Sequence, residues 1–327
     1  MSKLVTVIIP TIGREQLLKA SIKSVLYQTY HNIEILLSDN ASPINVGNVI
    51  HHLADERIRL VTRNSRLDYI SHIKLCIKEA KGEYLMILSD DDLISPDYIE
   101  NLVRAFDASD DVVAGFTPQK ILREDEMVLG EAPPCVYPSA IDGWKFLQMF
   151  MLGKIAVPMY SFVSLFTRRK LVVCSGLIEE FSGGSDGSHV DNYLLFSLAM
   201  KGRVVITDGL FGYRVHADST GLQTPFVNLF LASKAYEKKI LCLLSTRVTI
   251  FSKKYTLYKW IIKASLAEML LVRLKKYYVH RERTLVSNYY FLRVLSAYPI
   301  CVLYFISFGK SNLVKSIAVR LRNFLMS

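Results

Sequence analysis

Three consecutive carboxylates, Asp90, Asp91 and Asp92, are the side chains of this sequence best suited to chemistry. Because adjacent negative charges repel, a fold that gathers them usually offsets them with a cation. Carboxylate oxygens suit Mg²⁺ or Mn²⁺, ions that commonly also hold substrate phosphates. The alternative is an exposed acidic turn. The apolar run at residues 84–88 places the three residues after a buried strand, which favours a metal site.

Four other polar residues are candidates for binding or catalysis. Asp39 follows an apolar run, where a carboxylate can accept hydrogen bonds from a base or ribose. Asp191 begins a predicted helix after the Gly/Ser-rich residues 181–189, a suitable position for a general base beside a mobile loop. Arg214 and His216 could bind phosphate or metal. The alternatives are a turn residue for Asp39, a helix-start residue for Asp191 and a structural histidine.

The elements that must position these residues alternate along the first hundred residues. Apolar runs predict buried strands at residues 4–10, 33–37, 58–62 and 84–88. Helical spacing predicts helices at residues 15–28, 46–54 and 69–80. This alternation predicts a mostly parallel sheet, which binds ligands at the carboxyl ends of its strands. The polar clusters at residues 11–14, 38–40, 63–66 and 90–92 follow those ends, so we expect them to share one site.

The next hundred residues show a less regular pattern. We predict helices that begin at Ser95-Pro96, at the capping-box pattern of residues 139–142 and at Asp191, and strands at residues 163–167, 204–206 and 212–215.

The net charge of +10 is unevenly distributed over the 327 residues. Residues 225–327 hold 18 Lys and Arg against 3 acids, whereas residues 1–224 hold 22 against 27. The basic segment is apolar with helical periodicity, which favours amphipathic helices on an anionic membrane surface over a membrane span or a packed helical extension. It resembles no nucleic-acid-binding module, so we expect no nucleic acid partner.

Five scattered cysteines without a C-x-x-C pair indicate neither a zinc site nor a disulfide framework. The N-terminus has no apolar signal run. We therefore expect a cytoplasmic chain, peripheral on the inner face of the plasma membrane. Neither G-x-G-x-x-G nor a Walker A motif follows the first strand, which counts against dehydrogenases and P-loop enzymes.

Residues 5–42, 81–102 and 190–220 together resemble family 2 glycosyltransferases of the GT-A fold. The resemblance implies an α/β, Rossmann-like catalytic domain at residues 1–224, followed by the helical, basic, membrane-associating residues 225–327. It implies a nucleotide-sugar site formed by Pro10, Thr11, Arg14, Asp39, Asn64, Arg66 and Asp90. It also implies that Asp91 binds Mn²⁺ or Mg²⁺, that Asp191 is the catalytic base, and that Arg214 and His216 lie near the diphosphate, with His216 a candidate metal ligand.

Three departures from the family pattern suggest an unusual donor, for example a deoxysugar. Ser89 replaces the first Asp of D-x-D, Val190 replaces the Glu of the E-D pair, and residues 64–67 lack the usual Gly.

The expected function is inverting transfer of a sugar from a nucleotide-diphosphate donor to a saccharide acceptor, such as a polyprenyl-diphosphate-linked oligosaccharide for O-antigen or capsule. A sugar-phosphate nucleotidyltransferase is the nearest enzymatic alternative, although residues 11–14 match its phosphate-binding loop poorly. A non-catalytic membrane-binding protein is the other alternative.

Overall fold

The computed structural model describes residues 2–123, 125–127, 140–151, 165–173, 189–214, 226–248 and shorter stretches between 250 and 270. The chain forms two compact units. The first comprises residues 1–146, 157–180 and 185–223, and the second comprises residues 147–156, 181–184 and 224–327.

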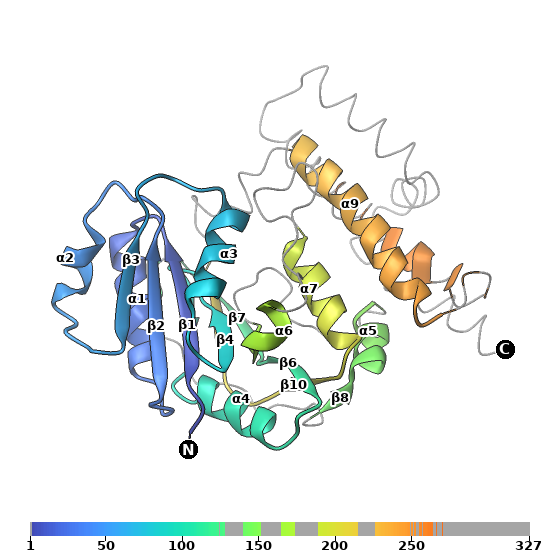
Figure 1. The fold of residues 1–327 in the computed structure, drawn as a ribbon, viewed down its shortest axis with the longest axis horizontal. Coiled ribbons are helices and arrows are strands. Elements are labelled where there is room, and N and C mark those ends of the chain that lie inside the picture. The colour runs from blue at the N-terminus through green and yellow to red at the C-terminus, as the bar shows by residue number, and fades with distance from the viewer. Residues whose placement is uncertain are drawn as a thin grey trace. The chain divides into compact units, whose positions relative to one another are not determined.

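The first unit is built on a five-stranded sheet in the order β3-β2-β1-β4-β9 (Figure 1). Its strands are β1 (Val5–Thr11), β2 (Ile33–Asp39), β3 (Ile58–Thr62), β4 (Tyr84–Ile87) and β9 (Thr167–Arg168). The first four are parallel and β9 is antiparallel to β4. From β1 the chain adds β2 and then β3 on one side of the sheet, and it then returns to add β4 on the other side of β1. Open α/β sheets bind ligands beyond the carboxyl ends of their strands at such a switch point.

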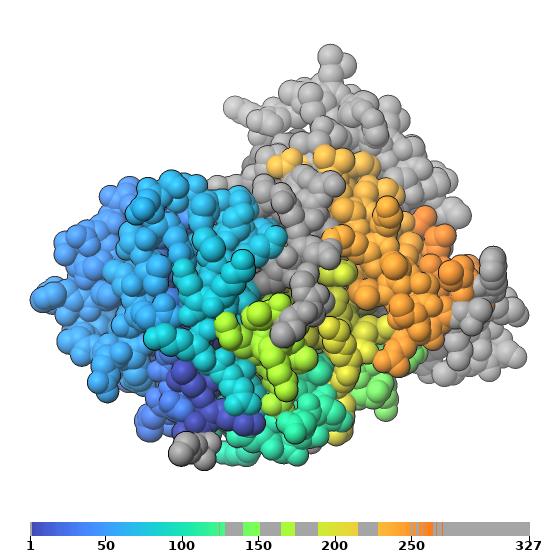
Figure 2. Space-filling view, viewed as in Figure 1, coloured from blue at the N-terminus to red at the C-terminus, as the bar shows by residue number. Residues whose placement is uncertain are grey.

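Helices α1 (Glu15–Leu26), α2 (Val46–His51) and α3 (Tyr69–Glu79) connect the parallel strands, so the predicted alternation of strands and helices is confirmed. Helix α1 buries Leu18, Ile22 and Val25, the apolar stripe expected from the sequence. Asp68 caps α3 by accepting a hydrogen bond from the backbone N–H of Ser71 at 2.9 Å. In the space-filling view the blue and cyan residues of these strands and helices form one continuous surface (Figure 2).

The helix predicted to begin at Ser95-Pro96 begins instead at Tyr98, as α4 (Tyr98–Asp107). The hydroxyl of Ser95 does not cap it, because this oxygen accepts a hydrogen bond from the N–H of Leu210 at 2.8 Å and donates to Asp97 at 2.7 Å. Gln28 takes over the helix start by accepting from the N–H of Ile99 at 2.9 Å. A long-range contact thus displaces a local capping signal.

Two three-stranded sheets complete the described part of the first unit. One has the order β6-β10-β8, with β6 (Val112–Phe116), β10 (Arg203–Ile206) and β8 (Ile141–Asp142). The other has the order β5-β11-β7, with β5 (Leu93–Ile94), β11 (Phe211–Arg214) and β7 (Gln119–Leu122). Helix α7 (Val190–Ala199) packs on β6, and α6 (Arg169–Val173) packs on β9 and α3, whereas α5 (Gly143–Met151) follows β8 along the chain. The helix predicted to begin at the capping-box pattern of residues 139–142 begins instead at Gly143, because Ile141–Asp142 pair with β10 as strand β8. Asp142 then accepts a hydrogen bond from the N–H of Lys145 at 2.9 Å and so caps α5 from the position before it.

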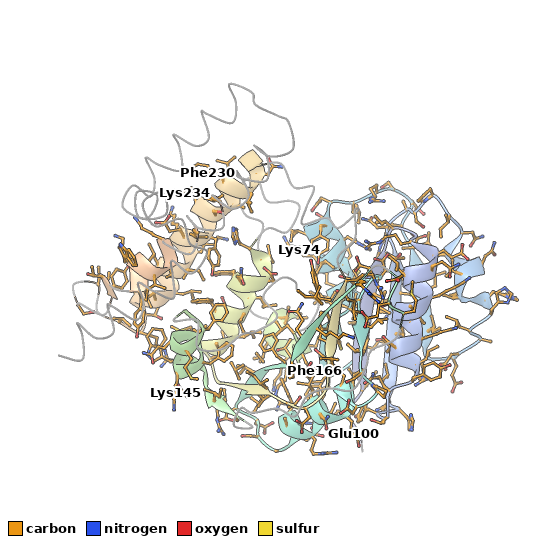
Figure 3. All side chains as sticks on the ribbon, turned by 180° about the vertical axis from the view of Figure 1, so that it is seen from behind. Lys74, Glu100, Lys145, Phe166, Phe230 and Lys234 are labelled. Atoms are coloured by element: carbon orange, nitrogen blue, oxygen red, sulfur yellow. The ribbon has the colours of Figure 1, made fainter. Side chains whose placement is uncertain are left out.

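The second unit contains α9 (Phe226–Ser245), so the described start of the basic segment is helical, as predicted. Phe230 and Ile240 are buried, and Figure 3 labels Phe230 and Lys234 on this helix. The carboxylate of Glu237, also buried, pairs with Lys234 at 2.9 Å and with Lys263 at 3.5 Å. Within the stretches that the model describes, every helix is too short or too polar to cross a membrane.

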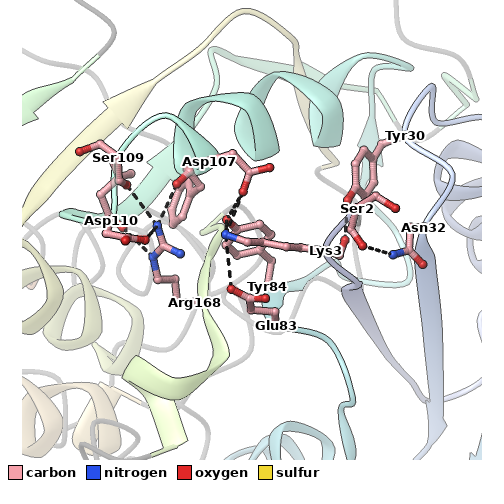
Figure 4. A network of polar contacts seen from close by, with 12 residues as sticks. Ser2, Lys3, Tyr30, Asn32, Glu83, Tyr84, Asp107, Ser109, Asp110 and Arg168 are labelled. Carbon is pink, nitrogen blue, oxygen red and sulfur yellow. Dashed lines mark hydrogen bonds and ion pairs between the residues drawn. The ribbon is translucent and has the colours of Figure 1, made fainter.

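A polar network at the amino-terminal edge of the sheet joins β4, β9 and α4 (Figure 4). Lys3 pairs with Asp107 at 3.0 Å and donates to the hydroxyl of Tyr84, also at 3.0 Å. Buried Arg168 donates to the backbone carbonyls of Phe106 at 2.8 Å and Ser109 at 3.1 Å. Its guanidinium also lies 5.5 Å from the ring centroid of Tyr84. This edge is a structural support opposite the carboxyl ends of the parallel strands.

We expect Arg168→Lys to lower the free energy of unfolding by about 2 kcal/mol, because a lysine ammonium cannot reproduce the planar set of donors to buried carbonyls. Chemical denaturation measures the change. The control is Arg104→Lys on α4, whose side chain is 72% exposed and, among the described residues, forms an ion pair with Glu100 alone. This change should shift stability by less than about 0.5 kcal/mol. Equal stabilities for the two variants would contradict this role for Arg168.

Candidate active site

The tips of β1 and β4 are joined by direct polar contacts at the switch point of the sheet. The hydroxyl of Thr11 donates to Asp90 Oδ2 at 2.6 Å and accepts from the N–H of Gly13 at 3.0 Å. Gly13 has a φ of +92°, and a Cβ there would come within 2.7 Å of Ile44. A glycine is therefore required at this turn, which carries the chain from Thr11 to the start of α1.

Arg14 crosses from this turn to the acidic segment. Its guanidinium pairs with Asp90 Oδ1 and, at 2.8 Å, with Asp91 Oδ2. Burial raises the pKa of Asp90, the charge of Asp91 raises it further, and Arg14 and Thr11 oppose the shift. A single guanidinium thus offsets part of the negative charge gathered by the strand ends.

Arg214 approaches the acidic segment from β11, because β5 and β11 pair antiparallel directly after the triad. The backbone N–H of Arg214 donates to Asp92 Oδ1 at 2.8 Å, and its Nε donates to the carbonyl of Asp91 at 2.8 Å. The side chain is buried and also donates to the carbonyl of Arg123 at 2.7 Å. Arg214 therefore shapes the backbone that presents the carboxylates and adds positive charge beneath them.

Asp39 lies beside this cluster at the end of β2, in register with Thr11. Its Oδ1 accepts from the N–H of Ser42 at 2.9 Å, and no hydrogen bond to Oδ2 occurs within the described residues. Next to it, the side chain of Asn40 exchanges two hydrogen bonds with the backbone of Leu67, each of 2.9 Å. That exchange holds the loop after β3 at the same edge of the sheet. Three of the predicted nucleotide-site residues, Pro10, Asn64 and Arg66, lie at this edge with partly or well exposed side chains.

Asp191 lies in the first turn of α7, where its Oδ1 accepts from the N–H of Asn192 at 2.8 Å. Burial raises its pKa from 3.8 to about 6, while the hydrogen bonds from the backbone oppose the shift. A carboxylate with this pKa is ionised at neutral pH yet basic enough to accept a proton.

Tyr69, the first residue of α3, feels the charges of both Asp191 and the acidic triad. Burial raises the pKa of its phenol, and the charges of Asp191, Asp91 and Asp92 raise it further. These carboxylates therefore lie within electrostatic reach of one hydroxyl group. The sequence analysis missed Tyr69, although its position after the cap Asp68, at the carboxyl edge of the sheet, was a usable signal.

The donor set suits a divalent ion that is bound jointly by protein and phosphate. Asp92 Oδ2 is buried without a hydrogen-bond partner among the described residues, and burial next to Asp91 raises the pKa of Asp92 well above its usual range. No group of three or more His, Cys, Asp or Glu side chains in the described ranges is arranged as a metal cage. The carboxylate oxygens gathered at the triad, among them the buried Oδ2 of Asp92, are donors of the type that Mg²⁺ or Mn²⁺ prefers.

The structure thus brings together Thr11, Arg14, Asp90, Asp91 and Arg214 by direct bonds, with Asp39 beside Thr11 and Asp191 near Tyr69. The predicted ligand His216 and residues 181–188 of the predicted loop lie outside the described residues.

This mostly parallel sheet flanked by helices, with acidic residues at its switch point, has the α/β architecture of the GT-A fold. The model for "Glycosyl transferase family 2" matches residues 6–174, just over half of the chain, so this chain belongs to that family.

Solved structures agree on the fold. Staphylococcus aureus TarS (residues 1–349) in complex with UDP aligns with a TM-score of 0.62 at 12% identity, covering 98% of this chain and 91% of that one. The mannosyltransferase PcManGT from Pyrobaculum calidifontis, in complex with GDP-Man and Mn²⁺, aligns with a TM-score of 0.55 at 15% identity, covering 99% and 88%.

Curated relatives match over shorter stretches. Glycosyltransferase GlyG of Streptococcus pneumoniae serotype 4 is 33% identical over 118 residues, which is 35% of this chain and 39% of that protein. The Escherichia coli UDP-Glc:alpha-D-GlcNAc-diphosphoundecaprenol beta-1,3-glucosyltransferase WfgD is 34% identical over 90 residues, 28% of this chain and 36% of that protein. This chain therefore spans about two fifths of the length of these relatives.

Proposed function

We propose that this chain transfers a sugar from a nucleoside-diphosphate donor to a hydroxyl group of a saccharide acceptor. The observation that carries the proposal is the joining of the β1 and β4 tips through Thr11, Arg14 and the acidic triad, with Asp191 in electrostatic reach. Family membership and the neighbouring structures with UDP and GDP-Man support a nucleotide-linked donor.

The donor is held from both ends in this proposal. Asp39 takes the base or ribose with Oδ2, and Asp91 would hold Mn²⁺ or Mg²⁺ beside the diphosphate. When bound, the ion neutralises the negative charge that develops on the leaving diphosphate. Arg14 and Arg214 supply further positive charge at the same edge of the sheet.

The acceptor hydroxyl is deprotonated by Asp191 as it attacks the anomeric carbon. Because Asp191 begins α7 and the diphosphate lies at the tips of β1 and β4, we place base and leaving group on opposite sides of the sugar. Attack opposite the leaving group inverts the anomeric configuration. The raised pKa of Asp191 suits this role, since a more basic carboxylate accepts a proton more readily.

We further propose that the acceptor is linked to a lipid diphosphate, in the synthesis of a surface polysaccharide such as O-antigen or capsule. The name of WfgD specifies a diphosphoundecaprenol-linked acceptor. The 18 basic and 3 acidic residues of 225–327 suit an anionic membrane surface. On this basis residues 1–224 form the catalytic domain, and residues 225–327 hold the chain peripherally on the inner face of the plasma membrane.

A binding screen with UDP, GDP, CDP and dTDP, with and without Mn²⁺, tests the donor site. We expect one nucleotide to bind in an Mn²⁺-dependent way, and Asp39→Ala to weaken its binding about tenfold through loss of a charged hydrogen bond. The control is Glu56→Ala, which removes an exposed acid that is not assigned to the nucleotide site. This change should have no effect on nucleotide binding.

The same reaction mixtures, supplied with the matching sugar nucleotide and a diphosphate-linked saccharide, distinguish the alternative functions. Sugar transfer with release of the nucleoside diphosphate supports the proposal. Release of pyrophosphate would favour a nucleotidyltransferase, and the absence of any nucleotide binding would favour a membrane-binding protein.

A further inference from the structure

Behind the candidate site, a buried chain of polar side chains connects α3 to the end of β2. Ser38 and His72 are 0% and 2% exposed, and Ser38 Oγ lies 2.8 Å from His72 Nε2. Arg63 Nη2 donates to the same Ser38 Oγ at 3.2 Å. Glu79 then receives both terminal nitrogens of Arg63, at 2.7 and 2.6 Å. The function proposed above does not use this chain directly.

The hydrogen-bond donors among these four side chains determine in which direction the hydrogen bonds run. A guanidinium can only donate, so Arg63 directs its N–H groups to Glu79 and to Ser38 Oγ. The Ser38 hydroxyl keeps one hydrogen, and the strongest acceptor next to it is His72 Nε2. The Cys76 thiol also lies against Ser38 and Arg63, but burial raises its pKa, so it remains a neutral thiol and a weak acceptor. With Ser38 as the donor, His72 is neutral and carries its proton on Nδ1, in agreement with the burial that lowers its pKa to about 4.

The same row of hydrogen bonds is connected to the backbone of Asp39 through Arg63. The backbone N–H of Arg63 donates to the carbonyl of Asp39 at 2.9 Å, while its side chain binds the adjacent Ser38. Ser38 and Asp39 end β2, and their side chains point to opposite sides of the strand. Arg63 thus hydrogen-bonds to the last two residues of β2, to one through its main chain and to the other through its side chain. His72 accepts the hydrogen of the Ser38 hydroxyl.

We propose that His72, acting through Ser38 and Arg63, is a positioning residue that sets the carboxylate of Asp39 for nucleotide binding. The proposal rests on the proposed function, because it assigns Asp39 to the base or ribose of the donor. Removing the acceptor leaves the Ser38 hydroxyl hydrogen without its partner in a buried site. We therefore expect the end of β2 to shift.

Kinetics with the sugar nucleotide identified in the screen test this role. We expect His72→Leu to raise the donor KM about tenfold with little change in kcat. His72→Gln should restore most of the wild-type KM, because its amide oxygen can replace Nε2 as the acceptor. In an Asp39→Ala background, His72→Leu should add no further effect on KM, whereas a general loss of stability would add to it.

Nitrogen-15 NMR of the histidines provides a readout that does not depend on activity. The proposal predicts a pyridine-type shift for His72 Nε2 and a pyrrole-type shift for Nδ1 at neutral pH. A protonated Nε2, an unchanged donor KM in His72→Leu, or additive effects with Asp39→Ala would each overturn it. A wild-type protein that binds none of the four nucleotides would instead contradict the proposed function. The NMR result would still report the direction of the hydrogen bonds between His72, Ser38 and Arg63.

Discussion

Replacing Asp191 by asparagine is expected to lower kcat for sugar transfer about 10³-fold and leave nucleotide affinity unchanged. The asparagine oxygen can still accept from the N–H of Asn192, as Asp191 does at 2.8 Å, so α7 keeps its start. The amide cannot take a proton from the acceptor hydroxyl, and only the chemical step is lost. Single-turnover transfer and nucleotide titration, measured on the same preparation, separate the two effects.

The pH dependence of the wild-type rate follows from the same carboxylate. Its pKa is raised from 3.8 to about 6, so Asp191 is charged and active above pH 6 and protonated below it. We expect kcat to fall about tenfold per pH unit below 6, because the base form decreases in that proportion. The residual rate of Asp191→Asn should lack this slope. A wild-type rate independent of pH between 4.5 and 7, or a fully active Asp191→Asn, would remove Asp191 from the mechanism.

Replacing Arg14 by methionine is the second large change, and it should lower the free energy of unfolding by about 3 kcal/mol without divalent ions. The substitution leaves Asp90, 1% exposed, and Asp91, 9% exposed, without the guanidinium that pairs with both. Mn²⁺ should restore much of the loss in the variant and stabilise the wild type less, because the ion binds where the charge is no longer balanced.

Denaturant unfolding with and without Mn²⁺ measures this effect. Lys19→Met is the matched control, since Lys19 lies on α1, the helix that follows Arg14, and its one ion pair among the described residues is with the exposed Glu15. Its stability should change by less than about 0.5 kcal/mol and show no additional response to Mn²⁺. An Arg14→Met variant as stable as the control, or one that Mn²⁺ does not stabilise further, would contradict a cation site at the triad.

The sequence predicts the first sheet well because each strand there is a continuous apolar run followed by polar residues. The apolar runs around Val7, Leu36 and Ile87 identify buried strands without knowledge of their tertiary contacts. Because the carboxyl ends of parallel strands lie at one edge of a sheet, the sequence also predicts that Thr11, Arg14 and Asp90 lie close together. The two small sheets were only partly predictable. Strands as short as Leu93–Ile94 and Ile141–Asp142 carry no periodicity, and their partners lie more than fifty residues away.

The roles of site residues were harder to predict than their neighbourhood. Arg214 was expected near a diphosphate, which stays a prediction, and nothing in the sequence indicates that its backbone and side chain also bond to Asp92 and to the carbonyl of Asp91. Tyr69 and His72 read as ordinary helix residues, because burial and charge from distant segments are not visible in local spacing. The Ser95 hydroxyl shows the same limit, since its partner Leu210 decides where α4 begins.

The arrangement of donor, ion and strand tips is tested most directly by crystals of the chain grown with Mn²⁺ and the nucleoside diphosphate that binds most tightly. The account predicts an anomalous manganese peak bonded to Asp91 and to the diphosphate, with the nucleoside at Asp39 and Asp191 facing the space beyond the terminal phosphate. A nucleotide bound away from the β1 and β4 tips, or a manganese ion without contact to the acidic triad, would contradict it.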